Sequence, residues 1–122
     1  MKKNLTSRLL WVALGYLGSG LIVALSLAPA SLRPHSVFGG YFEHWIAYAL
    51  VGAALGLGYR TIRLQLFALL ALTAGAATLE VLQTFIPGRS PEVAGFVASS
   101  LGAWFGLAVG VFAPALLRAA MK

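Results

Sequence analysis

The sequence predicts an all-α membrane protein, a single domain over residues 1–122 in which four transmembrane helices form a bundle. Hydrophobic residues make up 60% of the chain and charged residues only 10%, whereas soluble proteins average about half and about a quarter. A soluble fold of this size cannot bury so much apolar surface, but lipid covers it. The apolar residues also fall into four long runs, separated by connectors that contain proline, glycine or arginine.

The first two helices are predicted over about 9–28 and 42–58. Crossing the hydrocarbon core takes about 20 apolar residues, and the first run has that length without a charge. Its basic N-terminal flank and the sequence Ala28-Pro29-Ala30 also resemble a signal peptide, but the run exceeds the roughly 7–15 residues of a signal core. We therefore expect a retained anchor. The second run is shorter, and its predicted helix is extended to Phe42.

The third and fourth helices are predicted over about 64–86 and 93–117. Arg60 and Arg63 precede the third run, and Pro87-Gly88 ends it because proline and glycine stop helices. The fourth run follows Glu92, whose carboxylate suits the positive end of a helix dipole. A short connector of six residues therefore joins two long helices.

The basic residues predict the orientation of the bundle. With the N-terminus inside, seven lie on the cytoplasmic side and two, Arg33 and Arg89, outside. Because cytoplasmic loops are enriched in lysine and arginine, we expect cytoplasmic termini and outward connectors over Pro29–Phe42 and Pro87–Glu92. No basic stripe with interleaved aromatics predicts a nucleic-acid partner. The seven are Lys2, Lys3, Arg8, Arg60, Arg63, Arg118 and Lys122.

Small residues recur four apart in every run, which lets helix backbones approach closely in lipid. The first run has Gly15 and Ser19, and the third has Ala71 and Gly75. We expect all of these columns to pack helices against one another. The clearest columns, in the second and fourth runs, are Gly52, Gly56, Gly102, Gly106 and Gly110.

Polar residues inside a membrane protein are costly and often functional, and here they gather at the outer ends of the second and third helices. His44 and Tyr48 share one helix face, as do Glu80 and Gln83. Near lipid, the Glu80 carboxylate needs a partner, and Arg89 or His44 is expected to supply it. The candidate polar site is therefore His44, Tyr48, Glu80, Gln83, Arg89 and Glu92.

Two sequence blocks resemble the VanZ-like family of small bacterial membrane proteins. The first is His44-Trp45-Ile46-Ala47-Tyr48, and the second, residues 80–90, is similar to the family's Glu-x-x-Gln-x-x-x-Pro-Gly-Arg signature. Leu101-Gly102-Ala103 also matches, so the resemblance covers about residues 40–110. It implies a multi-pass protein of the bacterial cell membrane, associated with the cell envelope and, in some members, with tolerance of the glycopeptide teicoplanin.

The chain departs from the family pattern at two places. The family usually has Asp-Lys shortly before the histidine, where Gly40 and Tyr41 stand here. It also usually has an Asp and an Asn after the arginine, at positions that resemble Gly95 and Ser99. Glu92 lies one helical turn before Gly95, so it is placed to replace part of the missing carboxylate.

Three functional hypotheses follow. In the first, the outward polar site binds an anionic envelope component, lipid-linked or peptide, through a bidentate contact from Arg89, with His44 and Glu80 as acid and base if a reaction occurs. In the second, the chain is a small proton-coupled exporter, for which a carboxylate nearer the middle of the membrane is expected. In the third, it is a structural subunit of a larger membrane complex or a homo-oligomer.

The sequence contains no Ser/His/Asp set, no metal-site motif and no cysteine. It therefore predicts neither catalytic residues nor a metal or other cofactor, and enzymatic activity is not our preferred interpretation. The lipid bilayer is the one partner that the composition itself predicts.

Overall fold

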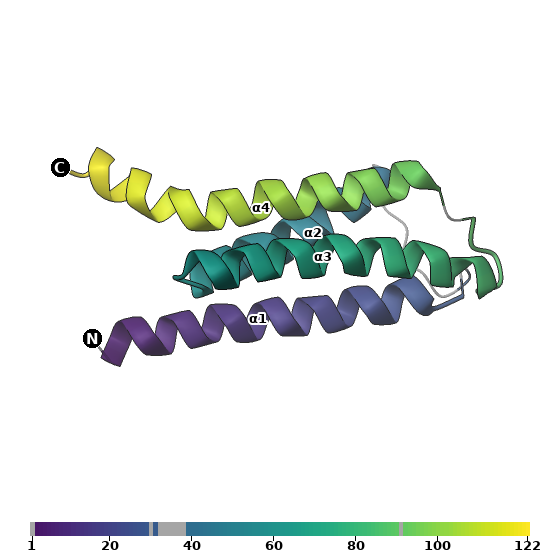
Figure 1. Ribbon diagram of the computed structural model, residues 1–122, viewed down its shortest axis with the longest axis horizontal. Helices are drawn as coiled ribbons and strands as arrows, with labels where there is room; N and C mark the ends of the chain where they lie inside the picture. The colour runs from purple at the N-terminus through teal and green to yellow at the C-terminus, as the bar shows by residue number, and fades with distance from the viewer. Residues whose placement is uncertain (1, 30, 32–38, 91) are drawn as a thin grey trace.

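The computed structural model describes residues 2–29, 31, 39–90 and 92–122. The described residues form four long helices, α1 (Lys2–Leu27), α2 (Gly40–Gly58), α3 (Ile62–Leu82) and α4 (Val93–Ala120), and the 3₁₀ turn η2 (Gln83–Phe85) extends α3. The described residues form no strand. Both termini lie at one end of the bundle (Figure 1). We name the opposite end, where α1 and α3 end and α2 and α4 begin, the connector end.

The predicted all-α class is confirmed, but the helices are longer than the apolar runs. α1 begins at Lys2 and α4 continues through Pro114 to Ala120, because polar residues that form helices well can extend a helix beyond its apolar part. The predicted end of the third helix at residue 86 was too late. The α-helix ends at Leu82, and Ile86 is extended with φ −98° and ψ 128° because the residue before a proline avoids the helical region.

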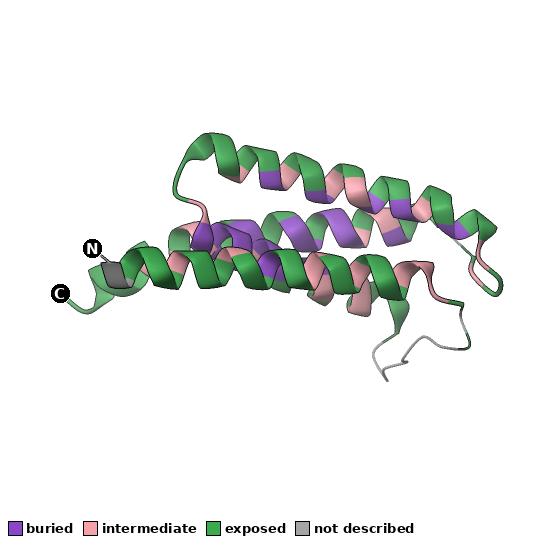
Figure 2. Cartoon of the chain, turned by 90° about the horizontal axis from the view of Figure 1, so that it is seen from below, coloured by how far each residue is buried: buried purple, intermediate pink, exposed green. Residues whose placement is uncertain are grey.

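Three helices are long and apolar enough to cross a membrane, over Asn4–Leu27, Ile62–Phe85 and Val93–Ala120. Only 6% of the apolar window of α1 and 39% of that of α4 are buried within the protein, and Figure 2 shows the mostly exposed residues along α1. Such an apolar exterior is compatible with lipid. α2 is shorter and contains eight buried residues among 19, and its passage through a membrane stays a prediction.

α2 and α4 pack with their backbones in contact. A Cβ atom built at Gly52 would lie 2.5 Å from the Ala103 carbonyl oxygen, and one at Gly56 would lie 2.6 Å from that of Leu107. On the facing helix, added Cβ atoms would approach backbone oxygens to less than 3.0 Å at each of Gly102, Gly106 and Gly110. The five glycines expected to pack helices therefore all lie at this interface, where any side chain would separate the helices.

The small residues of α1 and α3 behave differently. Cβ atoms at Gly15 and Gly18 of α1 would meet the Leu55 and Val51 side chains of α2, so α1 packs on α2 through glycine. A Cβ atom at Gly75 would have nothing within 4 Å. The prediction that the Gly75 column packs against another helix was therefore wrong, and this glycine lines an open groove.

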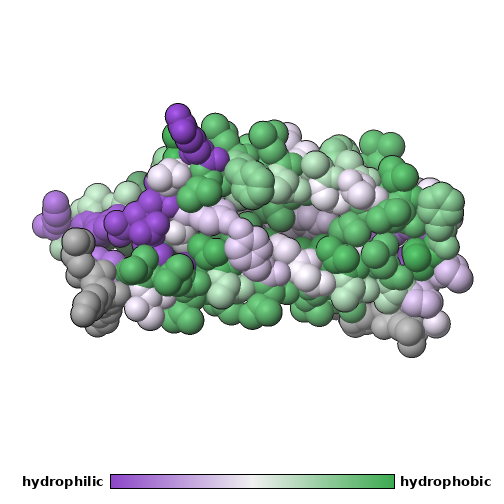
Figure 3. Space-filling model, turned by 60° about the horizontal axis from the view of Figure 1, so that its bottom comes forward, coloured by the Kyte–Doolittle hydropathy of each residue, from purple (hydrophilic) through white to green (hydrophobic). Residues whose placement is uncertain are grey.

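The terminal end of the bundle is basic. Hydrophilic surface gathers there, whereas apolar side chains cover most of the flank shown in Figure 3. Arg8 donates a hydrogen bond from Nε to the Gly58 carbonyl oxygen at 3.2 Å, which ties α1 to the end of α2. Arg60, in the α2–α3 connector, and Arg63, in the first turn of α3, are exposed. Arg33 and most of the predicted connector Pro29–Phe42 lie outside the described residues.

Candidate functional site

A cavity of about 270 Å³ lies at the connector end, between the start of α2, the end of α3 and the segment that leads into α4. Five of the six predicted site residues line it. The sixth, Tyr48, lies one turn deeper on α2 and lines a different groove. We name this cavity the polar cavity, and its lining residues are Gly40, Tyr41, His44, Glu80, Gln83, Gly88, Arg89, Ser90, Glu92 and Gly95.

Two carboxylates in the polar cavity connect three helices. Oε2 of Glu80, on α3, accepts a hydrogen bond from the backbone N–H of Glu92 at 3.1 Å. Glu92 is the residue that precedes α4, and its carboxylate accepts a hydrogen bond from the hydroxyl of Tyr41 on α2. The Glu80 carboxylate thus lies beside the start of α4, where the exposed N–H groups of a helix favour negative charge.

Gly95 lies where the Glu80 carboxylate meets α4. A Cβ atom at Gly95 would lie 2.6 Å from Oε1 of Glu80, which is shorter than any ordinary carbon–oxygen contact. Only glycine therefore fits at this position while Glu80 keeps its place.

His44 and Ser99 connect α2 to α4 beneath the carboxylates. Nδ1 of His44 lies 3.2 Å from the Ser99 hydroxyl oxygen, at hydrogen-bond distance. Ser99 is 2% exposed, so this hydrogen bond lies inside the bundle and holds the imidazole ring in one orientation. The imidazole ring therefore lines the polar cavity in a fixed orientation.

A tight turn directs Arg89 back toward α1. The backbone N–H of Arg89 donates to the Ile86 carbonyl oxygen at 3.2 Å, and Gly88 has a φ of 76°. A proline followed by a residue with positive φ is typical of a type II turn. The Pro87-Gly88 sequence therefore reverses the chain within two residues and places Arg89 against the end of α1.

Arg89 and Gln83 tie α3 and its connector to α1. Arg89 donates from Nε to the Ala28 carbonyl oxygen at 3.0 Å and from Nη2 to that of Leu25. Gln83, which is buried, donates from Nε2 to the Ser26 carbonyl oxygen at 3.0 Å. The last carbonyls of a helix lack partners within it and carry partial negative charge. A guanidinium group therefore closes α1 favourably.

The structure also contains site features that sequence reasoning missed. Tyr41 is not among the predicted site residues, yet its hydroxyl donates a hydrogen bond to the carboxylate of Glu92, which is 51 residues away in the chain. Ser90 and the glycines at 40 and 88 also line the cavity. The carbonyls of α1 carry no signal in a sequence, because every residue has one. Only the fold brings them to Arg89.

The polar cavity is rich in acceptors. Its ionisable lining residues are two glutamates, one arginine, one histidine and one tyrosine. The Nε–Nη2 edge of Arg89 already contacts α1, whereas Glu80 and Glu92 are acceptor groups when ionised. Hydroxyl or ammonium groups of a ligand suit these carboxylates. Among the described residues, no group of three or more histidine, aspartate or glutamate side chains is placed to hold a metal ion.

No protein-family model, curated protein or solved structure matches this chain.

Proposed function

We propose that the chain is a multi-pass protein of the bacterial cell membrane, of the VanZ-like kind, whose polar cavity faces outward and binds the polar part of an envelope component. The observation that carries the proposal is the meeting of the two sequence blocks. His44 from the first block and Glu80, Gln83, Gly88 and Arg89 from the second line one cavity. Residues on separate helices that converge on one hollow indicate a binding site better than a residue pattern alone.

The proposed ligand carries an anionic group together with hydroxyl or ammonium groups. An anion such as a phosphate suits Arg89, because guanidinium groups recognise phosphate and carboxylate strongly. The carboxylates of Glu80 and Glu92 repel a purely anionic ligand, but they accept hydrogen bonds from hydroxyl or ammonium groups on it. Phosphate-bearing head groups with sugar or amine substituents combine both features. A ligand with such a head group is a component of the cell envelope, and this is the proposed link to glycopeptide tolerance.

The distribution of charge supports an outward-facing cavity. Described basic residues gather at the terminal end of the bundle, where Arg60, Arg63, Arg118 and Lys122 are exposed. The polar cavity lies at the opposite end, next to Arg89. Because basic residues favour the cytoplasmic side, the terminal end is assigned to the cytoplasm and the polar cavity to the outer surface.

Saturation-transfer NMR on the full chain in lipid nanodiscs tests the proposal. The probes are glycerophosphoethanolamine, glycerophosphoglycerol and N-acetylglucosamine 1-phosphate, three soluble phosphate esters with amine or hydroxyl groups. We expect at least one to bind, and Glu80→Gln to weaken that binding about tenfold, the change expected for losing one charged hydrogen bond. Thr78→Val is the matched control, since Thr78 is exposed on α3 two residues before Glu80. Absence of binding, or equal binding by Glu80→Gln, contradicts the proposal.

A further inference from the structure

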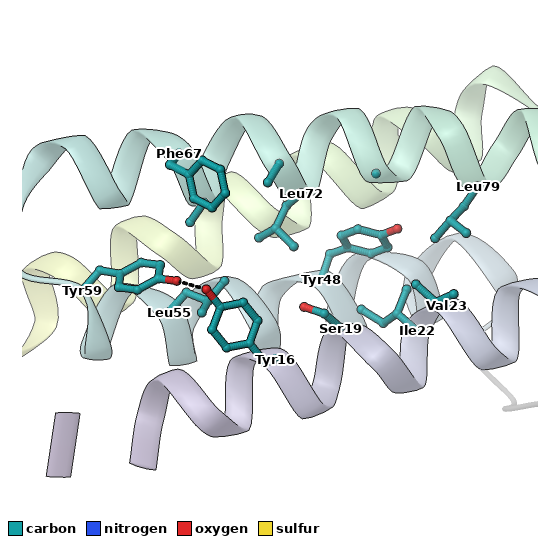
Figure 4. Close-up of a pocket in the computed structure, with 13 residues that line it drawn as sticks. Tyr16, Ser19, Ile22, Val23, Tyr48, Leu55, Tyr59, Phe67, Leu72 and Leu79 are labelled. Atoms are coloured by element: carbon teal, nitrogen blue, oxygen red, sulfur yellow. Dashed lines mark hydrogen bonds between the residues drawn. The ribbon is translucent and has the colours of Figure 1, made fainter. Parts of the chain in front are cut away.

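A second hollow, which we name the lateral groove, runs along the flank of the bundle. Its volume is about 290 Å³, and it lies between α1 and α3 with α2 behind it (Figure 4). Its lining is almost entirely apolar and includes Ile22, Leu55, Leu72 and Leu79. Tyr16 and Phe67 at its edges are 56% and 59% exposed. The groove is therefore open to whatever surrounds the bundle.

The dimensions of the lateral groove suit a single acyl chain. Its α3 wall runs from Phe67 to Leu79, which is about 18 Å at 1.5 Å per residue, against about 15 Å for one leaflet of the hydrocarbon core. The α3 wall of the groove is therefore about as long as the part of an extended acyl chain that lies in one leaflet.

Polar contacts mark both ends of the lateral groove. At the terminal end, the hydroxyls of Tyr16 and Tyr59 form a hydrogen bond (Figure 4). Burial, together with that hydrogen bond, raises the pKa of Tyr59 to about 12, so the Tyr59 hydroxyl is neutral at physiological pH. At the connector end, the hydrogen bond from Gln83 to the Ser26 carbonyl oxygen joins α3 to α1, and Gln83 also lines the polar cavity. A residue of the polar cavity therefore stands at the connector end of the groove.

The lateral groove continues toward the polar cavity. On α2, Tyr48 lines the groove and His44, one turn away, lines the cavity. Likewise, Leu79 on α3 lines the groove, and Gln83, four residues later at the start of η2, lines the cavity. One turn of four residues is about 6 Å along each axis. The Tyr48 hydroxyl points along the groove toward the Leu79 end (Figure 4), so polarity rises from the groove to the cavity.

We infer that the lateral groove holds one acyl chain of a membrane lipid whose phosphate-bearing head group lies in the polar cavity. The inference rests on the proposed function and assigns its ligand to the class of lipids. A lipid of this kind has an apolar chain that matches the lateral groove and a polar head group that matches the polar cavity. The two sites are one helical turn apart along α2. Gly75 lines the groove and has nothing within 4 Å of a Cβ position, so a chain can lie against the backbone of α3.

Two glycines provide a matched pair of variants for the test. Both Gly75 on α3 and Gly20 on α1 have nothing within 4 Å of a Cβ position. Gly75 lines the lateral groove and Gly20 does not. The first side-chain atom therefore fits at both positions without a clash, and leucine favours a helix over glycine at both. Only Gly75→Leu fills the groove. Circular dichroism and size-exclusion chromatography then check that both variants fold as the wild type does.

The experiment is native mass spectrometry of the full chain, extracted in mild detergent from vesicles of phosphatidylethanolamine and phosphatidylglycerol. The wild type and Gly20→Leu are expected to retain one lipid per chain. Gly75→Leu is expected to retain about tenfold less, because the added side chain takes the place of several chain carbons and their dispersion contacts. Equal retention by Gly75→Leu and Gly20→Leu overturns the inference.

A head-group variant separates failure of the inference from failure of the proposed function. If Glu80→Gln lowers lipid retention and Gly75→Leu does not, the head-group site stands and the groove assignment is overturned. If Gly75→Leu lowers retention while Glu80→Gln has no effect on it, and the soluble phosphate esters do not bind, the head-group assignment is overturned. Loss of retention in both variants supports a lipid that occupies both sites.

Discussion

The carboxylate of Glu80 fills the space that a side chain at Gly95 would need. A Cβ atom at Gly95 would lie 2.6 Å from Oε1 of Glu80, while Oε2 accepts the Glu92 backbone N–H at 3.1 Å. Both contacts join α3 to the start of α4. Gly95, the Glu80 carboxylate and the start of α4 therefore pack together, so a substitution at one of them changes the packing of the others.

Coupling between these two residues is the first prediction. Gly95→Ala is expected to displace the Glu80 carboxylate and to lower the free energy of unfolding by about 1–3 kcal/mol, the usual worth of a hydrogen bond to a charged group such as the one from the Glu92 N–H. In a Glu80→Ala background the same substitution has room, so its cost falls by about 0.5–3 kcal/mol, the range typical of contacting residues. Unfolding of the four proteins in mixed micelles, followed by circular dichroism, measures this coupling. Additive effects within about 0.3 kcal/mol contradict the contact.

The second prediction concerns the close packing of α2 on α4. A Cβ atom at Gly106 would collide with the Ala49 carbonyl group, and a backbone oxygen cannot rotate away as a side chain can. Gly106→Val is therefore expected to cost about 3 kcal/mol or more in stability, or to prevent folding. Gly20→Val, in open space, is the control in fluorescence-detected size-exclusion chromatography. Equal yield and melting temperature for the two variants contradict the packing.

Arg89 is expected to hold the end of α1. Lysine keeps the charge but lacks the planar group that reaches the Leu25 and Ala28 carbonyl oxygens together. Arg89→Lys should therefore cost about 2 kcal/mol of local stability, the usual worth of a hydrogen bond to a charged group. Hydrogen exchange read by mass spectrometry should rise in the last two turns of α1. Arg60→Lys, at an exposed site, is the control for replacing arginine with lysine. Unchanged hydrogen exchange in α1 of Arg89→Lys contradicts the role of Arg89 in holding α1.

The sequence predicted the number and order of helices well, because long apolar runs and breaking residues are local signals. The sequence did not predict where the third helix ends. Pro87 keeps Ile86 extended, and the three residues before Ile86 form the 3₁₀ turn η2. The sequence identified half of the residues that line the polar cavity, because positions near helix ends follow from topology. The Tyr41–Glu92 hydrogen bond, the attachment of Arg89 to α1 and the groove beside Gly75 depend on how helices pack. Spacing within one segment carries no information about such packing.

Membrane orientation is predicted from charge and can be measured directly, because the chain contains no cysteine. Ser90→Cys, at the polar cavity, and Arg63→Cys, in the first turn of α3, are both exposed. In intact cells, an impermeant thiol reagent should label the first and not the second, while lysed cells should show labelling of both. Labelling of Arg63→Cys alone in intact cells inverts the bundle and moves the polar cavity to the cytoplasmic side.

The most direct test of the central claim, that the polar cavity is a working site, is complementation of a strain that lacks the gene. Wild type, Glu80→Gln and Thr78→Val are expressed at matched membrane levels, and lipid-linked envelope precursors and glycopeptide tolerance are measured together. The account predicts that deletion alters these readouts, that wild type and Thr78→Val restore them, and that Glu80→Gln does not. Full restoration by Glu80→Gln contradicts the account, assigns the cavity a structural role only and favours a subunit that acts through its packing surfaces.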